Sequence, residues 1–195
     1  VSGAAANGVV IVARSGSGIN TLQDLAGHKI ASPQHGNTQD ISARHYVTAE
    51  LKQDASSVVP IPNAEHAGMM TRGEIDASWA PEPWGSFLVA QTGAKVVAAE
   101  RDLWPEKNFA ITLVVTTPEF LKKHPDAVEK VLQVHLEWTD RLKGDPQKYL
   151  PQLEQALFAL TNKRLPAGVL QSALPNVTFT EEPLPNTFVK FAQWS

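Results

Sequence analysis

In the first hundred positions, apolar residues form short runs, and amphipathic segments lie between these runs. The run GVVIVARSG, residues 8–16, is rich in valine and ends in glycine, which predicts a buried strand. Four further runs predict strands: HKIASP (28–33), SVVPIP (57–62), IDASWA (75–80) and AKVVAA (94–99). The segments between these runs predict one short helical turn and three helices.

The predicted helices alternate with the predicted strands. The turn is TLQDLAG, and the helices cover 38–51, 63–72 and 81–93. Asn63 is the expected N-cap of the second helix, and Gly73 is its left-handed stop. Because strands alternate with helices, we expect a parallel sheet that is covered on both faces and has right-handed crossovers.

After Trp104 the pattern changes. FAITLVVTT, residues 109–117, predicts one long strand, and the chain beyond Pro118 is mostly helical. The helix after Pro125 ends at Gly144, and apolar positions recur in it at spacings of three and four; His135 lies on this stripe, where we expect a packed, hydrogen-bonded side chain. The two long strands bracket a β-α segment, as two crossings between lobes would, although a single sheet with a helical tail fits equally well.

Composition narrows the classes of function. With 195 residues, 43% of them hydrophobic, the chain can fill a core, and no run of about 18 apolar residues predicts a membrane span. The N-terminus VSGAAANG lacks the features of a signal peptide. A net charge of −3 and scattered basic residues argue against nucleic acid as a partner. The absence of cysteine excludes disulfides, thiolate metal sites and a cysteine nucleophile.

Catalytic motifs are not found. GSGINT, residues 16–21, begins like a dinucleotide fingerprint, but Thr21 replaces the third glycine and the helix that follows is too short. The six histidines form no HExxH pattern, and there is no GxSxG or Walker motif. We therefore expect no enzyme, no cofactor and no metal. His35, beside Gly36, is the one histidine placed for a ligand role.

The segment GNTQD predicts a helix start that could hold an anion. Gly36 lets a ligand approach the backbone, and Asn37, Thr38 and Gln39 add neutral donors where the first-turn N–H groups and the helix dipole favour negative charge. The alternative is an ordinary cap, with Asn37 as N-cap and Asp40 in the capping-box position. Asp40 opposes an anion unless its side chain turns away.

A second candidate site is DASWAPEPWGSF, residues 76–87. Trp79, Glu82 and Trp84 follow or end a predicted strand, and ligands of open α/β sheets bind at the carboxyl ends of strands. Glu82 could accept from a ligand amine or from a protein donor, and both tryptophans could instead belong to the core. In a parallel sheet this segment and the GNTQD segment open onto the same edge.

Several segments together resemble one family. GVVIVARSGSGINTLQDLAGHKIASPQHGNT (8–38) is followed in order by GEIDA (73–77), WAPEPW (79–84) and TPEFLKKHPDAVEKVL (117–132). In this order they resemble the substrate-binding proteins of bacterial ABC importers for aliphatic sulfonates, nitrate and taurine. The resemblance extends over essentially the whole chain.

The resemblance implies an α/β fold of the two-lobed, type II periplasmic-binding-protein kind, with parallel-type sheets flanked by helices. Residues 1–21 and 109–195 are expected to form the first lobe with the hinge strands, and residues 22–108 the second lobe. Members of the family carry a long further segment before the first hinge strand, so the first lobe is expected to be incomplete.

The resemblance also implies a function. It is capture of a small organic oxyanion by closure of the lobes, and delivery to the membrane permease of an ABC importer by a periplasmic or otherwise extracytoplasmic monomer. Gln34, Gly36, Asn37 and Thr38 match the family's anion loop, and Trp79, Glu82 and Pro83 match its cleft lining. Two alternatives share the fold: the effector-sensing domain of a transcription regulator and a pyrimidine-synthesis enzyme of the thiamine pathway. An upstream winged helix would support the first, and the sequence shows none. The lack of cysteine and of a histidine cluster argues against the second.

Overall fold

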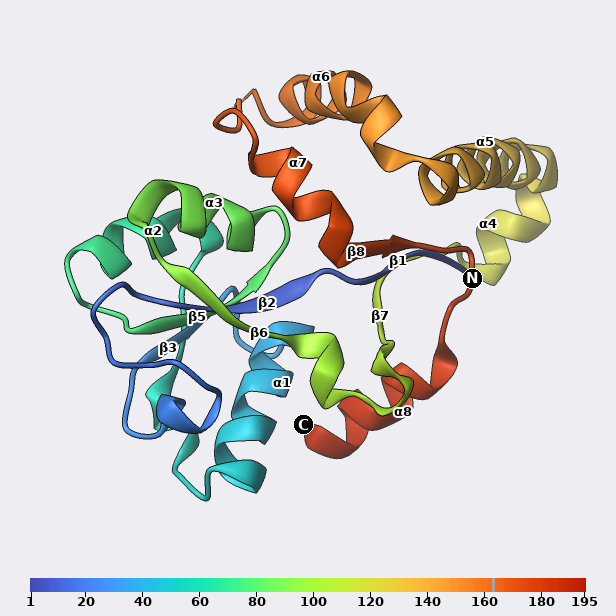
Figure 1. The fold of residues 1–195 in the computed structure, drawn as a ribbon. Helices are drawn as coiled ribbons and strands as arrows, with labels where there is room; N and C mark the ends of the chain where they lie inside the picture. Colours follow the sequence, from blue (N-terminus) through green and yellow to red (C-terminus); the bar gives the residue numbers. More distant parts are fainter. Residues whose placement is uncertain (163) are drawn as a thin grey trace.

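Two β-sheets organise the computed structural model, which describes residues 1–162 and 164–195 (Figure 1). Five strands form one sheet and three form the other. The strands are β1 Ser2–Asn7, β2 Val9–Ala13, β3 Ile30–Ser32, β4 Val58–Pro60, β5 Ala77–Pro81, β6 Lys95–Ala99, β7 Ala110–Val114 and β8 Val177–Phe179.

Helices surround both sheets. They are α1 Thr38–His45, α2 Asn63–Thr71, α3 Trp84–Thr92, α4 Pro118–Lys123, α5 Pro125–Gly144, α6 Leu150–Thr161, α7 Val169–Ala173 and α8 Pro185–Trp194. A π-helical segment, Tyr46–Glu50, continues α1. Six 3-10 turns lie at Gln23–Leu25, Ala55–Ser57, Glu100–Leu103, Pro105–Lys107, Pro146–Tyr149 and Leu174–Asn176. None of the described helices is long and apolar enough to cross a membrane.

Most predicted elements are confirmed, with corrections at their ends. The long helix runs from Pro125 to Gly144 as predicted, and Gly73 is left-handed, with a φ of 72°, just after α2. Asn63, however, is the first residue of α2 and not its N-cap, because Pro62 takes the N-cap position. The strand Ser2–Asn7 was not predicted, since SGAAAN has small residues and no apolar alternation.

The five-stranded sheet has the order β4-β3-β5-β2-β6 and is mixed. β3 runs parallel to β4 and to β5, as predicted, but β2 runs antiparallel to both β5 and β6. The all-parallel prediction is therefore wrong for β2. Its apolar run indicates burial on both faces, but strand direction depends on the path by which the chain enters the sheet.

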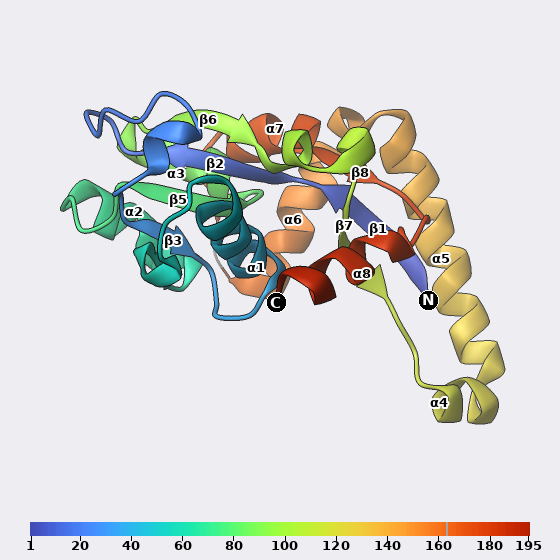
Figure 2. The same ribbon diagram turned by 90° about the horizontal axis from the view of Figure 1, so that it is seen from below.

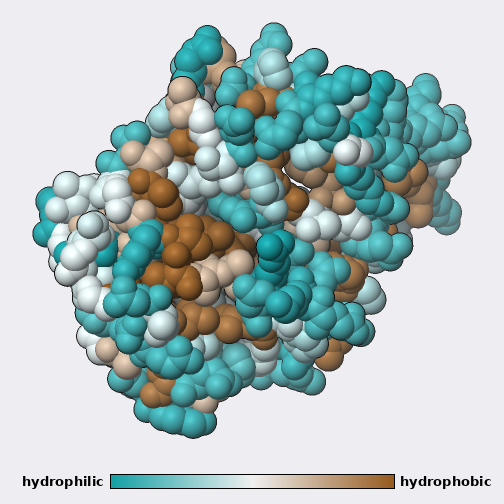
Figure 3. All heavy atoms as spheres, viewed as in Figure 1, coloured by the Kyte–Doolittle hydropathy of each residue, from teal (hydrophilic) through white to brown (hydrophobic). Residues whose placement is uncertain are grey.

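β2 lies between β5 and β6 in this sheet, and both of its faces are buried. Val9, Ile11 and Ala13 pack on the side of α1, whereas Val10 and Val12 pack on the side of α2 and α3. In Figures 1 and 2 these helices lie on opposite faces of the sheet. At the open edge, β6 exposes Val96 by 49%, and Figure 3 shows apolar side chains gathered over this region.

The three-stranded sheet has the order β7-β1-β8 and is antiparallel. α5 contacts β8, and His135 Nε2 lies 2.7 Å from the carbonyl oxygen of Gly3, so the predicted packed histidine is confirmed. The chain passes from β1 to β2 through two left-handed residues, Asn7 and Gly8, with φ angles of 62° and 71°. A Cβ atom at Gly8 would lie 2.9 Å from Val177 Cγ2, so only glycine fits this corner.

The division of the chain into two lobes stays a prediction. β2 was expected in the first lobe with the rest of residues 1–21, but it pairs with β5 and β6 of residues 22–108. A boundary at the corner between Asn7 and Gly8 agrees better with this pairing.

Candidate functional site

The two predicted site segments lie at the same edge of the five-stranded sheet. β3 and β5 are parallel, with Ile30 opposite Ala77 and Ala31 opposite Ser78, so their carboxyl ends meet there. β6 is antiparallel to β2, and β2 is antiparallel to β5, so Glu100, directly after β6, lies at this edge too. The expectation of a shared edge is confirmed.

The GNTQD segment forms a regular helix cap. Asn37 is the N-cap of α1, and its Oδ1 accepts a hydrogen bond of 2.9 Å from the N–H of Asp40. The N–H of Asn37 donates to the carbonyl of Gln34, which closes the preceding turn around a left-handed Gly36. The ordinary cap, one of the two alternatives that the sequence left open, is therefore present.

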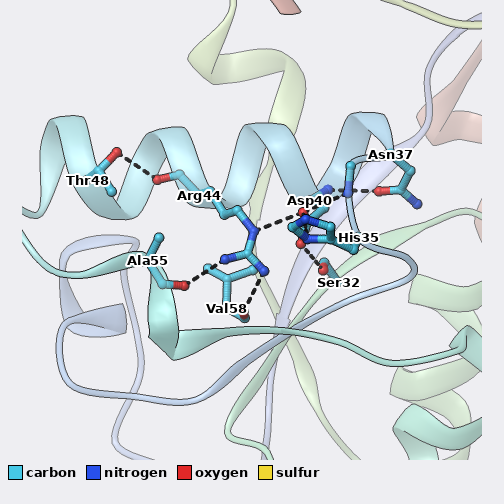
Figure 4. A network of polar contacts seen from close by, with 9 residues as sticks. Ser32, His35, Asn37, Asp40, Arg44, Thr48, Ala55 and Val58 are labelled. Carbon is cyan, nitrogen blue, oxygen red and sulfur yellow. Dashed lines mark hydrogen bonds and ion pairs between the residues drawn. The ribbon is translucent and has the colours of Figure 1, made fainter. Parts of the chain in front are cut away.

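Asp40 turns inward from this cap and is almost fully buried (Figure 4). Its Oδ1 accepts from Ser32 Oγ at 2.6 Å, and its Oδ2 accepts from Gly36 N–H and from Arg44 Nε, both at 2.9 Å. Burial alone would raise the pKa of Asp40, but the hydrogen bonds that it accepts, led by the one from Arg44, hold the pKa below its usual value. Asp40 is thus a buried negative charge that Arg44 compensates.

Arg44 connects α1 to the neighbouring strand. Besides Asp40, it donates to the carbonyl oxygens of Ala55 at 3.0 Å and of Val58 at 2.9 Å, and Figure 4 shows the side chain reaching from the helix to these groups. His35 Nδ1 lies 3.3 Å from Asp40 Oδ2 on the outer side, and its side chain is 76% exposed. This network fixes the start of α1 relative to the end of β3.

The predicted anion-loop residues differ in exposure. Gln34 and Gly36 are exposed, Asn37 and Thr38 are partly exposed, and Gln39 is buried. The Gly36 N–H, one of the predicted donors, is already bonded to Asp40. The outer donors at this edge are the side chains of Gln34, Asn37 and Thr38, together with the first-turn backbone N–H groups.

Trp79 lies in the core. Its side chain is fully buried, its Nε1 donates to Glu100 Oε2 at 2.6 Å, and its ring centroid is 5.9 Å from that of Tyr46. Trp84, five residues later, is only partly buried and packs edge-on against Phe87. Of the two tryptophans, Trp84 is therefore the one with surface at the edge of the sheet.

Glu82 is held by protein donors. Its carboxylate accepts from the N–H and Oγ of Ser86, both at 3.0 Å, and from Asn176 Nδ2 at 2.7 Å, while its own N–H donates to the carbonyl of Gly8. Pro83, joined to it by a cis peptide bond, is the N-cap residue of α3. Glu82 thus joins the start of α3 to the segment before β8.

Glu100 was not predicted as a site residue. It is 1% exposed, and its carboxylate accepts from Ser42 Oγ at 2.6 Å, from Trp79 Nε1 at 2.6 Å and from Trp104 Nε1 at 3.1 Å. Burial raises the pKa of Glu100 to about 7, although the three hydrogen bonds oppose the rise. Its only sequence signal is an acidic residue directly after a strand, four positions before a tryptophan.

The described residues do not form a metal cluster. Within residues 1–162 and 164–195, no group of three or more His, Asp or Glu side chains could hold a metal ion. Neutral donors, buried carboxylates and aromatic rings are the groups that these residues bring together at this edge.

Comparison with known proteins gives one family and one fold. Residues 5–150 match the NMT1-like family. No curated protein matches the chain. Solved structures of binding proteins match it along nearly its whole length, at low sequence identity.

Three of these structures illustrate the likeness. The periplasmic aliphatic sulphonate-binding protein SsuA from Escherichia coli is 22% identical, with a TM-score of 0.68 over 99% of this chain and 62% of that one. The ligand-binding component of an ABC-type import system from Staphylococcus aureus is 16% identical, with a TM-score of 0.75 over 98% and 65%. The alkanesulfonate-binding protein SsuA from Xanthomonas axonopodis pv. citri, bound to MOPS, is 18% identical, with a TM-score of 0.68 over 92% and 60%.

These matches establish the α/β fold of periplasmic binding proteins for this chain. The chain spans from 60% to 65% of the length of the three proteins compared. At these identities the likeness concerns the fold, and the ligand has to be argued from the residues of this chain.

Proposed function

The chain belongs to the NMT1-like family, and on that premise we propose that it is an extracytoplasmic solute-binding protein, which captures a small organic oxyanion for an ABC importer. The observation that carries the proposal is the fold match to two sulfonate-binding proteins over 99% and 92% of this chain. In this proposal the protein acts by binding and lobe closure, as a monomer in the periplasm or its equivalent, and passes its ligand to a membrane permease.

The start of α1 supports an anion as the ligand. The first-turn N–H groups of a helix lack partners within the helix, and the helix dipole adds about half a positive charge there. Asn37 and Thr38 are partly exposed at this position, and Gln34 is exposed beside them. Neutral donors of this kind hold an oxyanion without a basic side chain.

Asp40 is compatible with this site because of its orientation. Its carboxylate points into the protein, is 1% exposed at the side chain, and is paired with Arg44. The negative charge that would repel an anion is therefore compensated on the inner side of the cap. On the outer side lie the neutral donors Asn37 and Thr38, with the exposed side chain of His35 beside them.

The organic part of the ligand is proposed to lie against Trp84. Trp79 is fully buried, so Trp84 is the tryptophan of the WAPEPW segment with surface at the same sheet edge. A sulfonate or a related oxyanion with a small apolar or amino-substituted body has both an anionic group for the start of α1 and an organic part for Trp84. Gly36 and Gln39 shape the loop in this proposal, and Glu82 and Pro83 set the entry of α3.

A thermal-shift panel tests the proposal. The protein, in the longest form that its gene encodes, is heated with alkyl and aryl sulfonates, taurine, nitrate, bicarbonate and simple carboxylates. A ligand at about 100 times its Kd adds roughly 2.7 kcal/mol to the free energy of unfolding, which raises Tm by a few degrees. We expect a shift with one class of oxyanion. Equal shifts with all salts, or none with any, would contradict the proposal.

A further inference from the structure

A pocket of about 290 Å³ lies beside α1, and its lining includes none of the residues proposed above for the oxyanion site. Its walls come from α1 and its π-helical continuation, from the turn Glu100–Leu103, and from the C-terminal end of α8. Figure 2 shows the end of α8 next to α1. The lining residues that matter here are Ser42, His45, Tyr46, Glu100, Trp104 and Trp194.

The buried charge in this wall has only neutral partners. Glu100 accepts its three hydrogen bonds from one hydroxyl and two indole N–H groups, and among the described residues it forms no ion pair. A second carboxylate, Glu50, is exposed at the rim of the same pocket. A buried carboxylate is strongly stabilised when a cation comes into contact with it.

The other titratable groups at the pocket do not compensate this charge. Burial lowers the pKa of His45 and raises the pKa of Tyr46, so both are uncharged near pH 8. The Nζ of Lys190 lies 5.7 Å from the ring centroid of Trp194, but Lys190 does not line the pocket. At pH 8 the walls therefore carry negative charge alone.

Aromatic rings form the rest of the wall. Trp194 stacks on His45, with ring centroids 4.3 Å apart, and lies against Trp104 at 4.7 Å. Ring faces carry partial negative charge and attract organic cations, most strongly when water is excluded. The rings also provide an apolar surface for the body of such a ligand.

We propose that this pocket binds a small organic cation, a protonated amine on a compact ring or hydrocarbon body. The ammonium group would lie toward Glu100, and the body against Trp104 and Trp194. A volume of about 290 Å³ suits a ligand at the small end of the usual range. The inference does not depend on the oxyanion proposal, since none of the residues that line the pocket belongs to the proposed oxyanion site.

Titration with benzylammonium tests the inference, with benzyl alcohol as the uncharged probe of the same shape. Both are titrated at pH 8 into the longest form of the protein by calorimetry and tryptophan fluorescence. We expect saturable binding of benzylammonium, and binding of benzyl alcohol roughly tenfold weaker or more, because a charge-assisted contact contributes about 1.4 kcal/mol or more.

Variants locate the binding. Glu100→Gln removes the charge at nearly constant shape, and Trp194→Ala removes an aromatic wall contributed by a partly buried side chain at the end of α8. Each should weaken benzylammonium binding roughly tenfold, whereas Glu65→Gln, on the exposed side of α2, should leave it unchanged. If Glu100→Gln does not fold, Trp194→Ala decides. No saturable binding, equal affinity for the alcohol, or full affinity in Trp194→Ala would each overturn the inference.

Discussion

Asp40 and Glu100 are both almost fully buried, yet their pKa values move in opposite directions. Burial acts to raise both, but Asp40 has Arg44 as a partner, and Glu100 has only neutral donors. The charged neighbour Arg44 therefore keeps Asp40 ionised, whereas Glu100 has no charged neighbour to oppose the effect of burial. Asp40 belongs to the scaffold of the cap, whereas Glu100 is open to titration near neutral pH.

The high pKa of Glu100 predicts a specific dependence of stability on pH. The folded protein keeps this proton up to pH 7, whereas the unfolded chain loses it near 4.5. Glu100 therefore favours folding most at low pH, and this contribution is lost as pH rises from about 4.5 to about 7. A pKa change of this size corresponds to roughly 3 kcal/mol.

Urea unfolding of the wild type and Glu100→Gln at pH 5 and pH 8 measures this effect. The free-energy difference between them should shift by roughly 3 kcal/mol in favour of the variant on going to pH 8. Glu65→Gln is the control and should show no such shift. A difference that is constant with pH would show that Glu100 does not titrate in this range.

A substitution at Thr38 tests the role of the backbone N–H groups in the proposed anion site. It is the first residue of α1, a position where proline is well tolerated, so Thr38→Pro should fold while it removes one N–H donor. We expect oxyanion affinity, measured by calorimetry with the best ligand of the panel, to fall roughly tenfold or more. Thr38→Ala keeps the N–H and should lose less. Equal affinity in Thr38→Pro and wild type would remove Thr38 from the site.

At this scale the sequence predicts the cap but not the interior network. Asn37 followed by Asp40 is a recognisable capping pattern, because both partners lie within one helical turn. Glu100 lies 58 residues from Ser42 and 21 from Trp79, so no local pattern links them. The sequence also does not decide whether Trp79 lies in the core or in a cleft, because the environment of its side chain depends on the distant Glu100.

Among the elements, β2 and α3 contact each other through a glycine. A Cβ atom at Gly85 would lie 2.1 Å from Val10 Cγ2 and 3.5 Å from Glu82 Oε2. The small residue therefore allows α3 to lie close against β2.

Gly85→Ala is therefore expected to destabilise the protein. Alanine normally favours a helix over glycine by up to ~1 kcal/mol, but the contact with Val10 should reverse this to a net loss of roughly 1–3 kcal/mol. Gly144→Ala, in open space at the last residue of α5, is the matched control and should be neutral or stabilising. Urea unfolding compares them. A stabilised Gly85→Ala variant would mean that β2 and α3 separate easily.

The elements differ in how far the sequence predicts them. α5 is predicted from Pro125 to Gly144 because a 20-residue amphipathic helix has a strong period and clear end signals. The direction of β2 is not predicted, because it depends on strands more than sixty residues later. β1 is missed since its small residues have no period, and its partners, β7 and β8, are more distant still.

In the whole molecule, hydrogen bonds as well as the chain connections join the two sheets. Asn176, just before β8, donates to Glu82 at 2.7 Å, and its carbonyl accepts from Gly8 N–H at 2.8 Å. The residue therefore contacts both the corner between the sheets and the start of α3. Substitutions of Asn176 should therefore alter the contact between the two sheets.

Asn176→Asp places a second carboxylate against Glu82. At pH 7 the two like charges should lower the free energy of unfolding by on the order of 2 kcal/mol, and the loss should shrink as pH falls and one carboxyl takes up a proton. Thermal unfolding at pH 7 and pH 5 measures this. Asn186→Asp, exposed on α8, is the control. An equal Tm loss at both pH values would indicate lost packing instead of charge repulsion.

The strand order of both sheets has a consequence for protein synthesis. β1 and β2 are complete by residue 13, but β2 has to wait for β5 and β6, and β1 for β8 at residue 177. At roughly 5–20 residues per second, the ribosome needs about four to seventeen seconds to go from residue 13 to the end of β6 at residue 99. Until then the valines of β2 lack their native partner strands. A nascent-chain chaperone that covers this segment would thus protect the future five-stranded sheet, whereas a translational pause before β5 would prolong the exposure of β2.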